Sequence, residues 1–489
     1  MTRDDRKVHR TPLPKMQLFL VILIMFAEPV SSTVIYPFVN AFVRETGITR
    51  GDEKKTGYYA GIIESLFFVG EAASVVQWGR ASDRIGRKPV LMFGLVILSA
   101  SMFSFGLSKT FWLLVTSRFI QGVANGNIGV TKSAMGELTD STNMARAFGY
   151  IPLQWAAGAT VGPLIGGLFS RPAERWPKLF GRSDFLRSYP YFMPCAVAGL
   201  LSLMLLTVVA MGLQETLPAA IKRQQQKISR QSSIYASETT TLLNHGDGSA
   251  YNNSQLPSES MIPDIPDSEE SSPSIRSLLT PRLIILLINY TFLALVDQSH
   301  QVLLPLTYST SIPLGGLGFD PFTIGAIMGT WGMINGITQS IIFAPLVEKL
   351  GARRLYVVAF ACMLLVFPAY PLMSFLTKRA GGIVDAWVWT VLIMQLACNS
   401  MLFLCYGTMQ LYLVDSAPSK SAYGTTNGIA QMTASLCRSV SPALASSLYA
   451  ISLEHNLLGG SMVFCILWII TLAGVFASLH IPRAFTHPQ

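Results

Sequence analysis

Residues Trp78–Pro89 read WGRASDRIGRKP and carry four basic side chains and one acidic side chain. Apolar stretches at 57–79 and 89–107 border this segment on its two sides. An apolar stretch of about 20 residues is long enough for a helix to cross a bilayer. Short basic segments between such stretches are typical of the loops that join membrane-spanning helices. The charged segment is therefore predicted to be a loop between two spans.

Composition favours a membrane protein over a soluble one. Of the 489 residues, 51% are hydrophobic and 13% are charged, whereas soluble domains contain about 25% charged residues. The net charge of +9 also fits a nucleic-acid partner, but the basic residues lie between apolar stretches, where lipid headgroups explain them better. We therefore expect the lipid bilayer, and no nucleic acid, as a partner.

Twelve stretches are long and apolar enough to be candidate spans. They are 16–42, 57–79, 89–107, 110–135, 146–169, 190–213, 283–307, 322–346, 354–376, 385–413, 424–451 and 458–480. The first stretch lacks a small-residue cleavage site, so we interpret it as a retained helix and not as a signal peptide. The expected fold is an all-α integral membrane protein with twelve transmembrane helices.

The segment 217–281 divides these spans into two sets of six. It is rich in Ser, Gln, Asn and Pro and has almost no apolar periodicity, so it is predicted to be a disordered linker. The chain then has an N-terminal arm (1–15), a six-helix bundle (16–216), the linker, a second six-helix bundle (282–482) and a C-terminal tail (483–489).

The distribution of Lys and Arg predicts the orientation in the membrane. An even number of spans places both termini on one side, and basic residues concentrate in the N-terminal arm and in the loops after spans 2 and 8. By the positive-inside rule, that side is cytoplasmic, as is the linker. The segment 170–189 disagrees, because it carries five basic residues on the predicted outer side.

The opening loop has a weaker copy in the second half of the chain. DRIGRK at 83–88 matches EKLGAR at 348–353 in the order of an acid, a base, an aliphatic residue and Gly. Two sets of six spans that share a loop pattern are typical of transporters built from an internal repeat.

Several motifs together resemble a known family. GRASDRIGRK (79–88) resembles the loop 2–3 signature of the major facilitator superfamily, and RFIQG (118–122) resembles a second signature. GATVGPLIGG (158–167) is similar to the antiporter signature of its twelve-span drug:proton antiporters. GPLIGGLFSRPAERWPKLFG, followed by YPYFMPC and ETLP, resembles the zinc-induced facilitator-like transporters of plants and their fungal multidrug-type relatives.

The resemblance implies a secondary active transporter that works by alternating access of two bundles around a site at the membrane midplane. Proton-coupled export of small organic molecules, such as xenobiotics or secondary metabolites, is the expected function. The alternatives are import or symport of a nutrient, transport of metal chelates, and a membrane sensor that transports nothing. We expect the protein to act as a monomer, and we expect it in the plasma membrane rather than the vacuolar membrane. ETTTLL (238–243) argues for the second location, because it resembles an acidic dileucine signal for sorting to a vacuole or lysosome.

Enzymatic chemistry has no support in the sequence. The chain contains no nucleophile elbow, P-loop or cluster of metal ligands, so neither a catalytic residue nor a cofactor nor a metal is expected. All six cysteines lie inside apolar spans and none forms a CxxC pair, which is typical of small buried residues.

The predicted gating motif comprises Gly79, Asp83, Arg84, Gly86, Arg87 and Lys88. Its glycines permit a tight turn, and its arginine can pair with a carboxylate. The resemblance implies partners across the two halves and near the cytoplasmic end of span 4, where Glu137 and Asp140 are candidates. Such pairs would latch the inner gate. The alternative is a solvated basic loop.

The predicted antiporter motif comprises Gly158, Gly162, Pro163, Gly166 and Gly167. The glycines recur at helical spacing, which lets helix backbones approach closely, and the proline bends the helix. The resemblance implies that this helix seals one side of the transporter against leak. Helix packing alone is the alternative.

Charged residues inside spans are costly to bury and therefore point to function. Glu28 lies midway along span 1, before Pro29, and Asp297 lies midway along span 7. Burial favours the uncharged form of a carboxyl group, so both are candidate sites for a proton or cation. His300 shares roughly the same face as Asp297. The alternative is a structural ion pair.

Two buried cations accompany these acids. The resemblance implies that Arg118 on span 4 takes part in proton coupling. Glu64 and Glu71 are seven residues apart and share one face of span 2, and the resemblance places span 2 against span 11. Glu71 or Glu64 is therefore a candidate partner of Arg438 on span 11. Polar residues of the spans, such as Asn125, Gln154, Trp155, Gln298 and Gln301, are candidates for lining the cavity.

Overall fold

The computed structural model describes residues 11–140, 143–148, 150–217, 220–221, 279–416 and 423–482. Over these residues the regular elements are all helices, which confirms the expected all-α class. Residues 1–10 of the predicted arm, 222–278 of the predicted linker and the predicted tail 483–489 lie outside the described residues. The disorder of the linker and the sorting signal at 238–243 therefore stay predictions.

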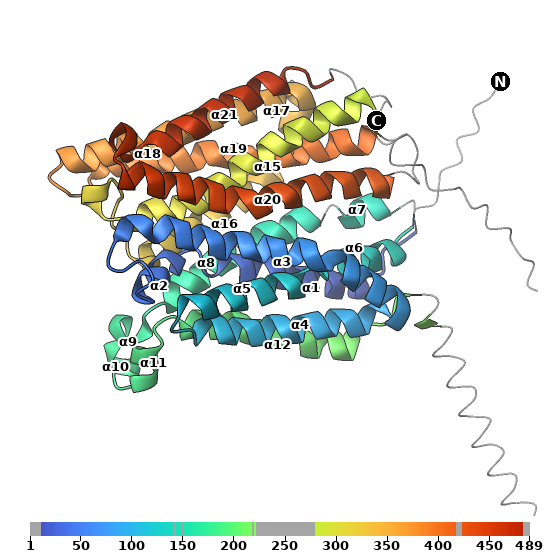
Figure 1. Ribbon diagram of the computed structural model, residues 1–489. Coiled ribbons are helices and arrows are strands. Elements are labelled where there is room, and N and C mark those ends of the chain that lie inside the picture. Colours follow the sequence, from blue (N-terminus) through green and yellow to red (C-terminus); the bar gives the residue numbers. More distant parts are fainter. Residues whose placement is uncertain are drawn as a thin grey trace, which may run out of the picture.

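The helices form two side-by-side sets whose axes run in roughly the same direction (Figure 1). The first set contains α1 (Lys15–Thr33), α2 (Val39–Glu45), α3 (Thr56–Ile85), α4 (Arg87–Gly106), α5 (Phe111–Asn125), α6 (Ile128–Glu137), α7 (Met144–Phe148), α8 (Ile151–Phe169), α9 (Pro172–Arg175), α10 (Pro177–Phe180), α11 (Asp184–Ser188) and α12 (Phe192–Gly212). The second contains α15 (Pro281–Ser309), α16 (Pro321–Leu350), α17 (Ala352–Ala361), α18 (Met363–Arg379), α19 (Ala386–Ser416), α20 (Tyr423–Glu454) and α21 (Met462–Ser478). Short 3-10 turns lie at Glu53–Lys55, Ile312–Leu314 and Leu457–Gly460.

Within the described residues, seven helical segments are long and apolar enough to cross a membrane, which identifies a multi-pass membrane protein. They coincide with predicted spans 1, 2, 3, 6, 7, 9 and 10. Helices also cover the other predicted spans. The total of twelve crossings stays a prediction.

The fourth predicted span is not one helix. α5 ends at Asn125 and α6 begins at Ile128. The Val123 carbonyl oxygen near the break accepts hydrogen bonds from Trp78 Nε1 (2.6 Å) and Ser74 Oγ (3.0 Å) of α3. Gly and Asn, the two residues between the helices, are poor helix formers. Side-chain donors from a neighbouring helix and low helix propensity together account for the break.

The two bundles pack through α8 against α16 and α3 against α20 (Figure 1). Small residues line both contacts. Gly167 of α8 faces Gly325 of α16, and Gly61 of α3 faces Ser446 of α20. A methyl group at Gly167 would lie 2.8 Å from the Gly325 Cα, so only glycine permits this approach of the two helices.

The bundles have two ends, which we name by their residues. The basic end is where α3 passes into α4 at Gly86, and the opposite end is where α3 begins. Hydrogen bonds join the bundles at the opposite end. Glu53 Oε1 accepts from the Ser311 backbone N–H at 2.8 Å, and Tyr58 OH donates to Glu454 Oε2 at 3.2 Å.

A groove of about 700 Å³ lies at the basic end between α1 and α8. It runs from Pro12 and Lys15, at the start of α1, to Phe26, and Gln154 and Ala157 of α8 also line it. Its volume is within the range of pockets that bind small organic molecules.

The basic segment 170–189, which disagrees with the predicted orientation, forms α9, α10 and α11 at the opposite end. Arg171 forms ion pairs with Glu45 and Glu174. The Arg175 guanidinium lies 3.3 Å from the centre of the Phe322 ring at the start of α16. These arginines therefore hold the opposite end together, within the first bundle and across to the second.

Candidate functional site

The gating motif covers the last turns of α3, the turn at Gly86 and the first turn of α4, so the segment predicted as a loop is helical except at Gly86. Gly86 has a φ angle of 109°, a conformation that favours glycine, and α4 begins at the next residue. The Arg87 guanidinium pairs with Asp83 Oδ1 at 2.7 Å and with Glu137 Oε1 at 2.8 Å. Its Nη1 also donates to Ser82 Oγ at 2.5 Å. Arg87 is therefore the centre of the turn.

The structure distinguishes between the two acids that the sequence proposed for this turn. Glu137, the last residue of α6, binds Arg87. Asp140 lies next to Thr11, whose Oγ1 donates to it at 2.5 Å, and its backbone N–H donates to Asn143 Oδ1. The partners of Arg87, which are Asp83, Glu137 and Ser82, all belong to the first bundle. A latch across the two halves therefore stays a proposal.

The remaining members of the gating motif have simpler surroundings. Gly79 and Arg84 lie on the last turns of α3, where Arg84 is exposed. Lys88 Nζ donates to the Ala210 carbonyl of α12 at 2.8 Å. The motif thus fastens α3, α4, α6 and α12 to one another at the basic end.

Glu215 is a member of this turn that sequence reasoning missed. Its carboxylate accepts the backbone N–H groups of Arg87 (2.8 Å) and Lys88 (3.1 Å), the first residues of α4. A carboxylate at a helix N-terminus satisfies free N–H groups and complements the helix dipole. Thr216 Oγ1 donates to Glu137 Oε2 at 2.6 Å. In the sequence, ETLP (215–218) gives only a family resemblance, because the acid and the turn that it caps are 128 residues apart.

Removal of this cap is expected to destabilise the first bundle. Glu215→Ala should lower the free energy of unfolding by about 1–2 kcal/mol, because the α4 N–H groups lose their acceptor. The measurement is thermal unfolding of the purified protein followed by tryptophan fluorescence. Gln214→Ala is the matched control, since Gln214 is exposed. Equal unfolding temperatures for the two variants would contradict the role of Glu215.

The antiporter motif on α8 contacts two helices. Gly158 and Gly162 face Pro29 and Thr33 of α1, Gly166 faces Val34 directly after α1, and Gly167 faces α16 of the second bundle. Pro163 lies inside α8, and its carbonyl oxygen lies against Gly325 of α16. The motif therefore joins α8 both to α1 and, across the bundles, to α16. A seal against leak is compatible with this packing and stays a proposal.

Arg118 is fully buried in the first bundle and forms an ion pair with Glu64 at 3.3 Å. Its guanidinium also donates to the Ser32 carbonyl (2.9 Å) and to Gln121 Oε1 (2.9 Å), and it lies 4.4 Å from the Phe67 ring centre. The structure thus places Glu64 against Arg118 and not against Arg438. The reason is that this part of α3 faces α5, which carries Arg118.

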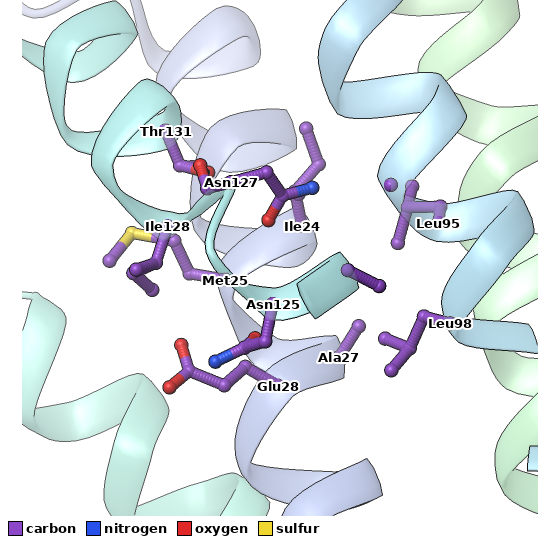
Figure 2. Close-up of a pocket in the computed structure, with 12 residues that line it drawn as sticks. Ile24, Met25, Ala27, Glu28, Leu95, Leu98, Asn125, Asn127, Ile128 and Thr131 are labelled. Carbon is purple, nitrogen blue, oxygen red and sulfur yellow. The ribbon is translucent and has the colours of Figure 1, made fainter. Parts of the chain in front are cut away.

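Glu28 on α1 is surrounded by a set of polar and charged side chains, which we call the Glu28 group. Glu28 lies beside Asn125 (Figure 2) and interacts electrostatically with Glu71 of α3 and Lys132 of α6. Asn125 Nδ2 donates to Glu71 Oε2 at 3.0 Å. Glu28 is 8% exposed, and within the described residues its Oε2 atom has no hydrogen-bond partner. Lys132 was missed in the sequence, although it lies inside the predicted span 110–135.

Asp297 on α15 is a buried acid of the second bundle. It is 7% exposed. Tyr406 OH of α19 donates to its Oδ2 at 2.8 Å, and Gln301 Nε2 donates to its Oδ1 at 3.1 Å. Tyr406 gave no signal in the sequence, because an uncharged aromatic residue in a span is usually only part of the packing.

Arg438 of α20 links the Glu28 group to the side chains around Asp297. It interacts electrostatically with Glu71 of the first bundle and with Asp297 and Tyr406 of the second. Its guanidinium lies 5.8 Å from the centre of the Trp155 ring of α8. The structure thus brings Glu28, Glu71, Lys132, Asp297 and Arg438 into one central cluster, to which both bundles contribute.

His300 is separate from this central cluster. Its Nδ1 lies 3.0 Å from Tyr370 OH of α18, and its ring packs against Phe367. Three residues along a helix fall about 60° short of a full turn, and this difference in direction is enough to point Asp297 towards α19 and His300 towards α18. The described residues contain no group of three or more His, Cys, Asp or Glu side chains that could hold a metal ion.

Comparison with known proteins gives consistent results. The sequence profile described as Major Facilitator Superfamily matches residues 21–442. The chain is 31% identical to the major facilitator-type transporter psiT2 of Psilocybe cyanescens, over 99% of this chain and 94% of that one. It is 28% identical to the major facilitator superfamily multidrug transporter mfsB of Aspergillus fumigatus (93% and 81% covered) and 28% identical to ZINC INDUCED FACILITATOR 1 of Arabidopsis thaliana (96% and 92% covered).

These matches include the two groups of relatives that the motifs indicated. They run through both bundles, and they are transporters and not enzymes. With the membrane-spanning helices and the central cluster between two bundles, they show that the chain belongs to the major facilitator superfamily of membrane transporters.

Proposed function

We propose that the protein exports small organic molecules in exchange for protons. The observation that carries this proposal is the position of Arg438, a cation of the second bundle that interacts with Glu71 of the first bundle and Asp297 of the second. The central cluster contains three acids and two bases within apolar surroundings. Its charge balance therefore depends on whether protons occupy the acids.

A proton on an acid of the cluster weakens the attraction that holds Arg438 between the bundles. Each bundle can then move relative to the other, which is the movement that alternating access requires. Loss of the proton restores the attraction. Proton binding is thus coupled to rocking of the bundles, because the charged residues lie where the two bundles meet.

The described conformation fits one step of that cycle. The groove of about 700 Å³ lies at the basic end, while Glu53, Tyr58 and the contact of Gly61 with α20 close the bundles at the opposite end. We assign the basic end to the cytoplasm, with both termini, by its Lys and Arg content. In the alternate state, Asp83 and Arg87 latch the basic end. The protein acts as a monomer in the plasma membrane.

The exchange of protons for substrate is tested in proteoliposomes. A leading compound is first identified by comparing metabolites of cells with and without the gene. Glu28→Gln and Asp297→Asn remove a titrating carboxyl at nearly constant volume, so each is expected to lower pH-driven transport of that compound roughly ten-fold. Asp184→Asn, an exposed acid in the first turn of α11 at the opposite end, is the control. Full pH-driven transport by both variants would refute the assignment of these acids.

Transport of metal chelates is the second candidate, because ZINC INDUCED FACILITATOR 1 is similar along 96% of this chain. A chelate would bring its own ligands, so the protein would not need a metal site. The same proteoliposomes distinguish the candidates when they are loaded with zinc alone, with a chelator alone and with both. Transport that requires zinc and chelator together would favour the second candidate.

A further inference from the structure

A small cavity lies inside the first bundle, next to Glu28 and the break between α5 and α6 (Figure 2). Its lining includes Glu28 of α1, Leu95 and Leu98 of α4, and Asn125, Asn127 and Thr131 at the break. α4 belongs to the side of the bundle away from the second bundle, so this cavity is distinct from the groove at the basic end.

The cavity matches one water molecule in size. It offers about 10 Å³ to the centre of a water, and a buried water needs roughly that much room and two to four polar partners. Leu95 and Leu98 form an apolar wall. Ca²⁺ takes about 6–8 oxygen ligands, more than the side chains of Glu28, Asn125, Asn127 and Thr131 provide, so we favour a water.

The polar side chains of the break supply the partners. Asn127 is 9% exposed, and Figure 2 shows its amide directed between α1 and α4. Within the described part of the chain, this amide makes no hydrogen bond to another side chain. Thr131 Oγ1 donates to the Asn127 carbonyl at 3.2 Å and keeps its acceptor capacity. Asn125 donates through Nδ2 to Glu71, which leaves its Oδ1 to accept from a water.

We propose that this cavity is a site for one structural water, bound by Asn125, Asn127 and Thr131, which holds the Asn125 amide in the orientation that faces Glu71 and Glu28. The charged groups that face Glu28 are Glu71 of α3, Lys132 of α6 and Arg438 of α20. Asn125 is the neutral donor among them. The water is thus a positioning element that sets how readily these acids release their protons.

The water site rests on the proposed function in one respect, which is that Glu28 and Glu71 exchange protons during transport. Its test needs no substrate. Infrared difference spectra of the purified full-length protein, recorded between low and high pH, follow the carboxyl bands and the stretching bands of buried water. Glu28→Gln and Glu71→Gln identify the two carboxyl bands. The wild-type protein is expected to show a water band that shifts when H₂¹⁸O replaces ordinary water.

Gly94→Ala removes the room for this water. A methyl group at Gly94 would overlap Asn127 Nδ2 and lie 3.0 Å from its Cγ, so the amide must leave its present position beside the cavity. The water band should disappear, and the titration midpoint of the two acids should move to higher pH by roughly one unit, since the charged forms lose an oriented donor. Asn127→Leu removes the polar partner by a different route and should give the same shift.

Gly136→Ala is the matched control, because a methyl group there meets nothing within 4 Å. It should leave both the water band and the titration unchanged. A wild-type protein without a band sensitive to H₂¹⁸O would overturn the proposal. So would titrations of Gly94→Ala and Asn127→Leu that equal that of Gly136→Ala. Failure of the proposed function would appear separately, as full pH-driven transport by both Glu28→Gln and Asp297→Asn in proteoliposomes.

Discussion

Arg118→Leu is expected to lower the free energy of unfolding by about 3–5 kcal/mol, because it leaves the buried carboxylate of Glu64 without its ion-pair partner. Glu64 is 2% exposed and Arg118 is 0% exposed, so water cannot replace the lost partner. The Ser32 carbonyl and Gln121 lose a donor in the same substitution. Thermal unfolding of the purified protein in detergent measures the effect.

The double variant Glu64→Leu and Arg118→Leu separates the cost of an orphaned charge from the cost of lost volume. Replacing both partners of a buried ion pair with apolar residues is often close to neutral in stability. We therefore expect the double variant to unfold at a higher temperature than Arg118→Leu alone. If the single and double variants unfold together, the pair contributes no charge-specific stability.

Gly61→Leu is expected to lower transport roughly 10- to 100-fold, because it prevents closure at the opposite end. A side chain at Gly61 would meet the Pro442 carbonyl oxygen at 2.9 Å and the Ala443 Cα at 3.0 Å, both backbone atoms of α20 that cannot turn away. Each bundle can still fold, since the clash lies between them. The variant should therefore reach the membrane but stay open at the opposite end.

Two measurements together identify that state. Transport is measured in proteoliposomes, and accessibility is measured by labelling a cysteine introduced at Ser65, whose Oγ accepts from the Ala443 N–H across the bundles. Labelling should rise as transport falls. Gly428→Leu on α20 is the control, because a methyl group there meets nothing within 4 Å. Low transport without increased labelling would contradict the closure argument.

The sequence was sufficient for the class of fold and for the position of most helices. Apolar stretches of span length and basic loops are local signals, and they depend on the membrane as a solvent. The break between α5 and α6 was not predictable from the apolar pattern. It depends on Trp78 and Ser74 of another helix, which bind the Val123 carbonyl.

The sequence indicated some residues of the candidate site, but Lys132 was missed and most of the pairs were not predictable from it. An acid or base inside a span is visible in a sequence, which is how Glu28, Asp297 and Arg438 were found. Partners depend on how each helix is rotated about its axis. Glu64 and Glu71 share a face by spacing, yet the structure places one against Arg118 and the other against Asn125.

The cap formed by Glu215 has a consequence for biosynthesis. Glu215 is near the last residue of the first bundle, and it fastens the start of α4, which is made more than a hundred residues earlier. The ribosome must therefore complete all of the first bundle before this turn can close. The segment 217–281 then takes about 3–13 s to translate at roughly 5–20 residues per second. During that interval the first bundle can assemble in the membrane before any helix of the second emerges to compete for its contacts.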